Sequence, residues 1–296
     1  MNDVATPSKL LARMTDAEHQ SLTKTFFGLF YGDKGTRKTT TAQGLAQKLR
    51  GDGEILFVDS AEGFVSLDRF PVLKKHTQHL RVDDPRELMV ISKAMRPRAK
   101  GFENFTVVVL DEYSSWWTDT LHAFAYEQAG LDPDKDELPI IDWTWYGPPQ
   151  QAMLNVLKNF DKTPNLHVII VAHEQGRALK GEKNGPDRIT PLLGTKLSAS
   201  IGQLAHVVGR FESRKVRNDY ETEVQIQPSR YVEAKSRLSN TNEIKLSSKD
   251  LVKVIAEWVH GSDMEADLAR PEPSVEVEVA VEDTEDEDFE IVDDEG

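Results

Sequence analysis

Residues 32–40, GDKGTRKTT, have the residue types and the spacing of a phosphate-binding loop. The consensus of such loops is G-x-x-x-x-G-K-[ST], and Gly32, Lys38 and Thr39 occupy its first glycine, its lysine and its hydroxyl position. Backbone N–H groups of the loop surround a phosphate, the lysine reaches the β- and γ-phosphates, and the hydroxyl binds Mg²⁺. We therefore expect nucleotide phosphates to contact the following residues: Gly32, Asp33, Lys34, Gly35, Thr36, Arg37, Lys38, Thr39 and Thr40.

The position before the lysine departs from this consensus, because Arg37 stands where glycine is usual. Glycine is favoured there because the backbone runs close to the phosphates and can need a conformation that costs other residues ~1 kcal/mol or more. An arginine offsets part of this cost if its side chain points away, or if its guanidinium reaches the γ-phosphate or a neighbouring subunit. Since the other residues of the site are in place, we expect the loop to be functional.

Polar residues follow three hydrophobic runs further along the chain. VVVLDE ends with Asp111 and Glu112, FVDSAEG contains Glu62, and VIIVAHE contains His173. Asp111 is predicted to hold Mg²⁺ through water, and Glu112 to orient or deprotonate the attacking water. Glu62 is a second candidate carboxylate. His173 is a candidate sensor of the γ-phosphate, and the alternative is a histidine that only satisfies hydrogen bonds at a strand end.

Continuous apolar runs predict the buried strands that position these residues: 25–32, 54–59, 105–112 and 166–174. Between them the sequence predicts helices, among them an amphipathic helix that ends near Gly51 and two others over 85–96 and 149–160. Buried strands separated by helices indicate an α/β fold with a mostly parallel sheet flanked by helices. More alternating segments within 204–235 predict an antiparallel or mixed extension, and 247–261 predicts a terminal helix with a serine N-cap.

The negative charge of the chain is concentrated near its C-terminal end. Residues 263–296 contain 16 of the 50 acidic residues and one of the 36 basic residues, so residues 1–262 keep 34 and 35. The near-neutral body leaves nucleic-acid binding open, and the tail lacks the periodicity of a folded segment. We expect a lead-in over 1–24, one folded domain over 25–262 and a disordered acidic tail over 263–296. The tail either adds solubility or, the interpretation we favour, competes with DNA or recruits basic partners.

The composition argues against several classes of protein. Without cysteine there is no disulfide framework and no cysteine-ligated metal centre. No apolar run approaches the ~18 residues that cross a bilayer, and the first residues lack the apolar core of a secretory signal. We therefore expect a cytoplasmic protein with no membrane contact.

Five segments taken together resemble a known group of proteins. GDKGTRKTT, FVDSAEG, VVVLDE, VIIVAHE and YVEAKSR, spread over about residues 25–240, are similar to the RecA-like P-loop ATPases of bacteriophages. That group includes AAA-type nucleotide-binding proteins and RecA-like single-strand annealing proteins. The resemblance implies a RecA-like fold, ATP and Mg²⁺ as cofactors, and a role in phage recombination or replication in the cytoplasm of the host cell.

The resemblance also implies roles for individual residues. In RecA-like enzymes the glutamate after the second strand activates water, which matches Glu62, but a one-residue difference in spacing leaves Glu62 and Glu112 as alternatives. The residue that senses the γ-phosphate matches His173. Lys235 and Arg237 match basic residues that reach the γ-phosphate of a neighbouring subunit, so ATP would join the protomers of a homo-oligomer. The alternative for this last pair is two solvated charges on an edge strand.

The segment 174–196 occupies the place of the mobile DNA-binding loop of RecA-like proteins. It contains no aromatic residue for stacking on bases, so a solvated surface loop is an equal alternative to a loop that binds single-stranded DNA. Phosphate contacts need charge but little shape. The basic residues that would supply this charge are Arg177, Lys180, Lys183, Arg188 and Lys196.

Aromatic residues are concentrated in the middle of the chain. We interpret Trp116, Trp117, Trp143, Trp145 and Tyr146 mainly as core or lid packing, with base stacking as the less favoured alternative. In HTQH, His76 and His79 have a spacing that can place two ligands on one helix face, but no third ligand is near and we do not expect a metal there.

The residues and the resemblance support three functional hypotheses. The first is an oligomeric, DNA-stimulated ATPase that acts on single-stranded DNA, with a single-stranded-DNA-binding protein as a candidate partner. The second is a nucleotide-dependent DNA-annealing scaffold with little or no hydrolysis. The third is a P-loop motor or loader of another phage DNA pathway.

Overall fold

The computed structural model describes residues 24–60, 63–177, 188–216 and 219–261. Its α-helices are α2 (Lys38–Leu49), α3 (Pro85–Met95), α4 (Tyr113–Ala129), α5 (Gly147–Asp161), α6 (Thr195–Leu204) and α7 (Ser248–His260). Its short 3-10 helices are η1 (Gly63–Leu67), η2 (Pro71–Lys74) and η3 (Trp143–Tyr146). Its strands are β1 (Phe27–Gly32), β2 (Glu54–Asp59), β3 (Thr77–Arg81), β4 (Phe105–Asp111), β5 (His167–Arg177), β6 (Arg188–Pro191), β7 (Val207–Val216), β8 (Asp219–Gln225), β9 (Lys235–Ser236) and β10 (Lys245–Ser247).

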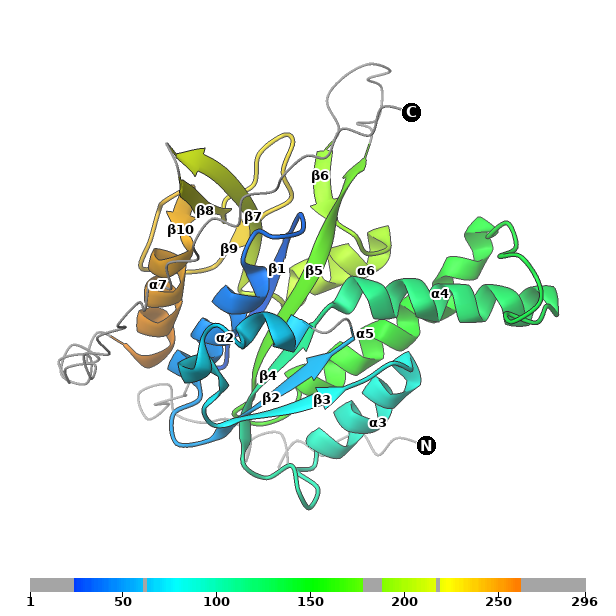
Figure 1. The fold of residues 1–296 in the computed structure, drawn as a ribbon, viewed down its shortest axis with the longest axis horizontal. Coiled ribbons are helices and arrows are strands. Elements are labelled where there is room, and N and C mark those ends of the chain that lie inside the picture. Colours follow the sequence, from blue (N-terminus) through cyan, green and yellow to red (C-terminus); the bar gives the residue numbers. More distant parts are fainter. Residues whose placement is uncertain (1–23, 61–62, 178–187, 217–218, 262–296) are drawn as a thin grey trace, which may run out of the picture. The chain divides into compact units, whose positions relative to one another are not determined.

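The strands form one mixed sheet in the order β10-β8-β7-β1-β5-β4-β2-β3, with β6 joined to β5 and β9 joined to β7 (Figure 1). The six strands from β7 to β3 run parallel, and β8 and β10 are antiparallel at one edge. Gly32 is in register with His173, and Asp111 is in register with Val171 and Asp59. The loop after β1 and the polar ends of β2, β4 and β5 therefore meet at the carboxyl edge of the sheet.

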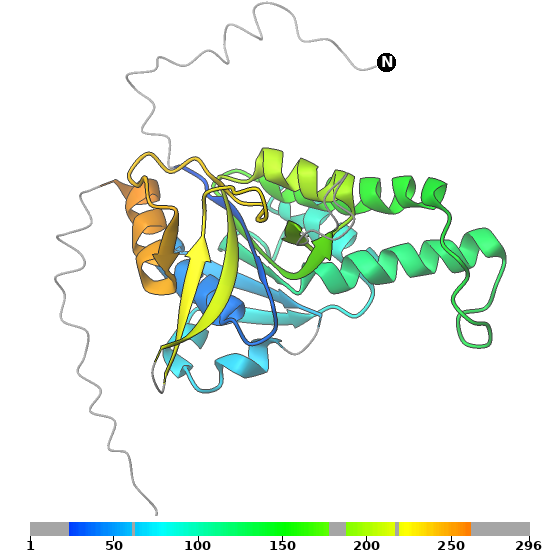
Figure 2. The ribbon, with the colours of Figure 1, turned by 90° about the horizontal axis from the view of Figure 1, so that it is seen from above.

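Two layers of helices cover the sheet (Figures 1 and 2). Helices α2 and α7 cover one face, where Val109 of β4 packs in a buried cluster with Leu45 and Leu251. Helices α3, α4, α5 and α6 cover the other face, where Leu110 of β4 packs in a second cluster with Trp116. Because successive strand residues point to opposite faces, the uninterrupted apolar runs build both cores at once. Among the described residues, no helix has both the length and the apolar character that a membrane crossing requires.

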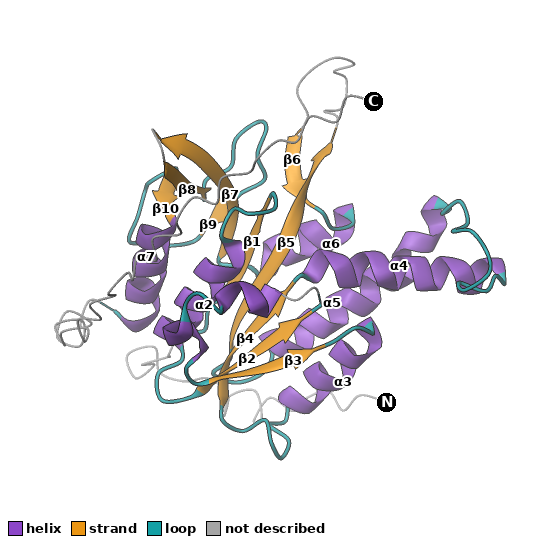
Figure 3. Ribbon diagram, in the orientation of Figure 1, coloured by secondary structure: helices purple, strands orange, loops and turns teal. Residues whose placement is uncertain are grey.

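The structure confirms the predicted α/β class, with a mostly parallel sheet between helices and an antiparallel extension (Figure 3). It differs in three local features. His79 lies in β3 at the exposed edge of the sheet, so His76 and His79 do not occupy the common helix face that their spacing would allow. Strand β5 runs on to Arg177, beyond the predicted end at residue 174. The segment YVEAKS contributes only the two residues of β9.

The predicted lead-in over 1–24, apart from Lys24, and the predicted acidic tail over 263–296 lie outside the described residues. Their boundaries stay predictions. A candidate catalytic residue, Glu62, also lies outside the described residues.

Candidate nucleotide site

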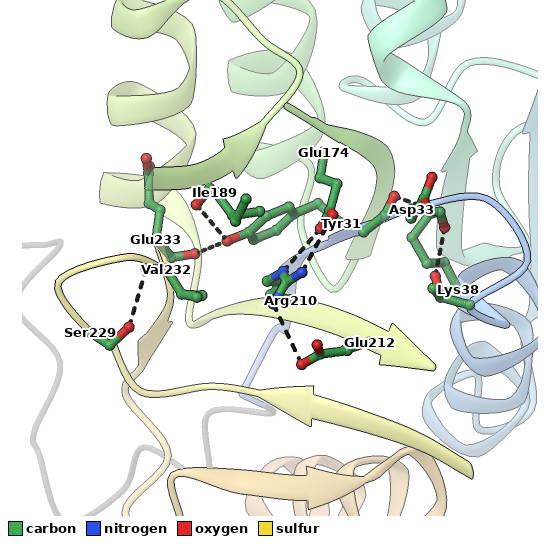
Figure 4. A network of polar contacts seen from close by, with 12 residues as sticks. Tyr31, Asp33, Lys38, Glu174, Ile189, Arg210, Glu212, Ser229, Val232 and Glu233 are labelled. Atoms are coloured by element: carbon green, nitrogen blue, oxygen red, sulfur yellow. Dashed lines mark hydrogen bonds and ion pairs between the residues drawn. The ribbon is translucent and has the colours of Figure 1, made fainter. Parts of the chain in front are cut away.

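The loop after β1 is held at its base by a strand that is buried along its whole length. Lys38 begins α2, is 6% exposed, and donates hydrogen bonds from Nζ to the carbonyl oxygens of Gly32 at 2.9 Å and Asp33 at 2.7 Å (Figure 4). Burial lowers the pKa of Lys38, and the carboxylates of Glu112 and Asp111 oppose this effect. The ammonium is thus fixed inside the curve of the loop, where phosphate oxygens can replace the two carbonyl acceptors.

Arg37 adopts the left-handed conformation, with φ 61° and ψ 23°, immediately before α2. The conformation is the physical reason for glycine at this position of the consensus, and it costs a residue with a Cβ roughly 1–2 kcal/mol. The side chain of Arg37 is exposed, which is one of the two ways in which we expected an arginine to be tolerated. The carbonyl of Arg37 still accepts the first hydrogen bond of the helix, from Thr41 N at 3.0 Å.

Thr39 and Asp111 join the loop to the end of β4. Thr39 Oγ1 donates to Asp111 Oδ2 at 2.8 Å. Asp111 is 3% exposed, and burial raises its pKa to about 7, with the charges of Glu112 and Asp59 acting in the same direction. At Gly63 an added Cβ would lie 2.2 Å from Asp111 Oδ2, so the glycine lets the chain pass close to this carboxylate.

The oxygen atoms of Thr39 and Asp111 are the ligand type that Mg²⁺ takes, and the ion usually keeps waters and substrate phosphates as its remaining ligands. Among the described residues, no group of three or more His, Cys, Asp or Glu side chains could bind a metal. The donor set fits an ion that arrives with a nucleotide.

Glu112 is held by two side chains. His173 Nε2 contacts its Oε2, and Ser114 Oγ donates to its Oε1. The backbone N–H of His173 donates in turn to Ser114 Oγ at 3.0 Å, so the end of β5 and the start of α4 hold one carboxylate between them. Glu112 is 8% exposed. The two strand-end residues predicted to act at a γ-phosphate are therefore in direct contact.

These residues line one cavity of about 600 Å³ at the carboxyl edge of the sheet. The loop contributes Lys34, Gly35, Thr36, Arg37, Lys38, Thr39 and Thr40, and the strand ends contribute Asp59, Asp111, Glu112 and His173. The structure thus brings together the loop, the predicted metal ligands and two of the predicted catalytic residues.

Lys235 and Arg237 lie elsewhere. Strand β9 pairs with the first residues of β7, at the end of the sheet opposite the loop. The side chains of Lys235 and Arg237 donate to the carbonyl oxygens of Gly202 and Gln203 at the end of α6. Neither side chain lies at the phosphate loop of its own chain, so a role at a phosphate would have to be played in a neighbouring subunit.

The segment 174–196 is described only in part. Strands β5 and β6 form a hairpin, paired from Glu174 with Pro191 to Arg177 with Arg188. Residues 178–187, which include Lys180 and Lys183, lie outside the described residues. The DNA-binding loop at this hairpin stays a prediction.

A polar network connects the base of this hairpin to the loop strand (Figure 4). Arg210 of β7 forms an ion pair with Glu174, with 2.9 Å between Nε and Oε2. The hydroxyl of Tyr31, in β1, donates to the carbonyl oxygens of Glu233 and Ile189. Burial raises the pKa of this hydroxyl. Tyr31 therefore connects the strand that enters the phosphate loop to β6, and Arg210 connects β7 to β5.

Sequence reasoning missed the residues that support the site rather than occupy a motif. Ser114 could have been found, because it lies two residues after Glu112 in the first turn of the helix that follows β4. Arg210 carries no such signal, since it contacts Glu174 across β1 and from 36 residues away.

Comparison with known proteins identifies one family. The family described as an AAA domain matches residues 26–238. Two solved structures are similar to this chain: the RadB recombinase (15% identity, 68% of this chain and 79% of the other, TM-score 0.39) and the flagellar accessory protein FlaH from Methanocaldococcus jannaschii (12%, 75% and 84%, TM-score 0.40). No curated protein matches the chain. The matched range contains the loop, both strand-end carboxylates and His173, and it confirms the AAA-type part of the predicted resemblance.

Proposed function

The chain belongs to the family described as an AAA domain, and on that premise we propose that it is an Mg²⁺-dependent ATPase of RecA-like type, stimulated by single-stranded DNA. One observation carries the proposal. A lysine inside a phosphate-binding loop, a hydroxyl–carboxylate pair and a buried glutamate converge in a single cavity. The chemistry of phosphoryl transfer asks for positioning and charge stabilisation, and these groups supply both.

Each side chain has a task that follows from its position. Lys38 would bind the β- and γ-phosphate oxygens in place of the carbonyls of Gly32 and Asp33. Thr39 and Asp111 would hold Mg²⁺, Asp111 through water, and the bound ion would neutralise charge on the phosphate oxygens. Glu112 would orient the attacking water or take its proton.

His173 connects the proposed DNA-binding hairpin to the carboxylate of Glu112. It holds Glu112 from the end of β5, and β5 continues into the hairpin that carries the proposed DNA-binding loop. Arg210 and Glu174 fix the same end of β5 to β7. Single-stranded DNA bound at the hairpin would shift β5. This shift would change the hydrogen bonds that orient Glu112.

The decisive experiment measures the ATPase rate with and without single-stranded DNA for three chains. Lys38→Ala should lower the rate at least about a hundredfold, because it removes the charge that faces the phosphates. Lys48→Ala, an exposed lysine of the same helix, is the matched control and should retain the wild-type rate. A wild-type ATPase rate in Lys38→Ala would refute the proposal. A wild-type ATPase rate that single-stranded DNA does not raise would refute the proposed stimulation by DNA.

A second function, a nucleotide-dependent annealing scaffold with little turnover, is favoured by one observation. Ser114 and His173 each contact one carboxylate oxygen of Glu112, so only the remaining lone pairs of these oxygens can accept a proton from water. Tight nucleotide binding without hydrolysis, together with faster annealing of complementary strands, would select this function. A motor or loader of another phage DNA pathway would instead show movement or loading that depends on hydrolysis.

The proposed enzyme is a homo-oligomer with ATP between its subunits, and a single-stranded-DNA-binding protein is a candidate partner. Support for the interface comes from the sequence resemblance of Lys235 and Arg237 to residues that act across a subunit boundary. In the folded chain both side chains bind carbonyls at the end of α6. They would have to exchange those acceptors for phosphate oxygens of the neighbouring subunit.

A further inference from the structure

A second cavity, of about 740 Å³, lies beside the nucleotide cavity. The two cavities share α4 and β5: Ser115 and His173 line the first, and Trp117 and Gln175, two residues further along each element, line the second. We call the second one the aromatic cavity. Its lining also includes Trp143 and Tyr146 of η3, Gln150 of α5 and Lys196 of α6. None of these side chains takes part in the ATPase site.

The walls of this cavity are aromatic and partly open to solvent. The ring centres of Trp117 and Tyr146 lie 6.3 Å apart with their planes tilted by 40°. Trp143 is 83% exposed although it is large and apolar. Exposed aromatic faces beside a cavity offer contact area to a flat ring, and nucleic-acid bases stack on side chains of this kind.

Gln150 provides the second observation. Its side chain lines the cavity, is 8% exposed, and makes no hydrogen bond to any residue that the structure describes. Neither amide atom is among the fully enclosed side-chain atoms that lack a partner, so the amide faces the open part of the cavity. A Cβ on Gly194 would lie 2.4 Å from Gln150 Nε2 and 2.8 Å from Trp117 Cζ2, so only glycine leaves room there for the amide and the indole. The amide is therefore available to the donors and acceptors of a ligand.

The start of α6 adds positive charge next to this amide. The helix begins at Thr195, and its N-cap residue, Gly194, has no side chain to accept from the first turn. Lys196 is exposed in that turn. A helix N-terminus with a lysine favours an anion such as a phosphate. Gln175 differs from Gln150, because its Nε2 donates to the carbonyls of Pro191 and Leu193. Its amide therefore stabilises the wall of the cavity and does not contact a ligand.

We propose that the aromatic cavity binds one unpaired nucleotide of a single-stranded DNA. The base would stack on the aromatic side chains, Gln150 would bond to its polar edge, and the adjoining phosphate would lie at the start of α6 near Lys196. An apolar molecule would leave both the amide and the positive helix end unused. The proposal rests on single-stranded DNA as the partner in the proposed function, and it supplies the base contact that the segment 174–196 lacks.

The test measures binding of a fluorescent oligo(dT) and of an oligomer of equal length without bases. Trp143→Ala should weaken binding of oligo(dT) about tenfold and leave binding of the abasic oligomer unchanged, since only the former stacks. Trp143→Phe keeps a ring and should bind within about twofold of wild type. Trp145→Ala, in the same short helix but outside the lining, is the matched control. Equal binding of the two oligomers by the wild type, or of oligo(dT) by wild type and Trp143→Ala, would overturn the proposal.

Gln150→Leu separates a ligand-binding role from a packing role. The leucine has a similar size and removes the unpaired amide, so the melting temperature should stay the same or rise while oligo(dT) binding weakens three- to tenfold. A variant that loses stability and binding together, or that keeps full binding, would contradict the assignment. Free thymidine monophosphate should quench the tryptophan fluorescence only at much higher nucleotide concentration than oligo(dT). Quenching at equal or lower concentration would assign the cavity to a free nucleotide instead.

The outcomes also separate this proposal from the ATPase. If Trp143→Ala responds to DNA with the same ATPase stimulation as wild type, the cavity assignment fails and the proposed function stands. If no chain hydrolyses ATP but oligo(dT) binding still depends on Trp143, the proposed function fails and the cavity assignment stands.

Discussion

The two ends of the parallel sheet use polar side chains differently. At the amino end, where the parallel strands begin, side chains bond to the backbone. Nδ1 of His167 accepts from Phe26 N and Nδ1 of His206 accepts from Phe27 N, both at 3.0 Å, so two neutral imidazoles hold the start of β1 from either side. Such bonds replace water for backbone groups that would otherwise be buried without a partner.

At the carboxyl end, side chains bond to one another. Thr39 pairs with Asp111, and Glu112 pairs with His173 and Ser114. This end keeps charged groups out of water at a cost that shows in the raised pKa of Asp111. The difference suggests a rule for this molecule: loss of a side chain at the amino end lowers stability, and loss of one at the carboxyl end lowers the rate of hydrolysis.

The largest expected effect belongs to the carboxyl end. Glu112→Gln should lower the ATPase rate about 10²- to 10⁴-fold, because the amide cannot take a proton from water, with little change in nucleotide affinity or melting temperature. The measurement is steady-state hydrolysis beside ADP binding, with Glu127→Gln, at an exposed residue of the helix that follows Glu112, as the control. A near-normal rate in Glu112→Gln and a large loss in Glu62→Gln would assign the general base to Glu62.

The amino end should instead respond in stability and to pH. Burial, aided by the charge of His260, lowers the pKa of His167 from 6.5 to about 4. As the pH falls, the unfolded chain binds the proton before the folded chain does. The contribution of His167 to the free energy of unfolding, up to about 3 kcal/mol, is therefore complete above pH ~6.5 and is lost as the pH falls through about 4. Urea unfolding at several pH values should show a smaller acid loss in His167→Asn, which still accepts from Phe26. The exposed His76→Asn is the control, and equal pH slopes in all three chains would contradict this assignment.

Arg237 tests the rule that side chains at the amino end of the sheet affect stability alone. It bonds to a backbone carbonyl of α6, which predicts a loss of about 1 kcal/mol in Arg237→Gln. The proposed interface predicts, in addition, a tenfold or greater drop in ATPase rate. Mixing Arg237→Gln with Lys38→Ala should then restore part of the rate, because each chain supplies what its neighbour lacks. A stability loss with an unchanged rate would leave Arg237 as a purely structural residue.

The smallest effect is expected at Arg37. Arg37→Gly relieves the left-handed strain, but glycine also gains freedom in the unfolded chain, so the net gain in stability is at most about 1 kcal/mol. Thermal unfolding measures it, with Arg37→Asn as an intermediate case because asparagine tolerates this conformation. A loss of stability in Arg37→Gly would show that the guanidinium makes a favourable contact.

Much of the carboxyl end could be predicted from the sequence, because its signals are local. The loop follows a buried strand and precedes a helix, and Asp111 and Glu112 end the strongest apolar run. Parallel pairing then brings these ends together. The register of Gly32 with His173, which places the histidine beside the loop, depends in addition on β1 and β5 being neighbours in the sheet, and no local pattern of the sequence shows that.

The rest depends on contacts between distant residues that no local pattern records. Strand β3 is polar because it is an exposed edge, so no apolar run marks it. Lys235 is positioned by β9, and only two residues of this strand pair with the start of β7. The contact of Gln150 with Gly194 joins two helices and depends on the absence of one methyl group, which is visible only in the folded chain.

The position of β1 in the sheet has a consequence for how the protein is made. Its partners β5 and β7 come late in the chain, and Gly32 pairs with Phe211, 179 residues further on. At 5–20 residues per second, a ribosome needs roughly 10–35 s to supply that partner. The apolar segment 25–32 has no neighbouring strand until β5 is complete at Arg177, and its second neighbour β7 follows later still. We therefore expect the nascent chain to need a chaperone and to bind nucleotide only near the end of synthesis. Nascent chains arrested before residue 207 should therefore fail to bind ATP, and binding by such chains would show that the loop forms without β7.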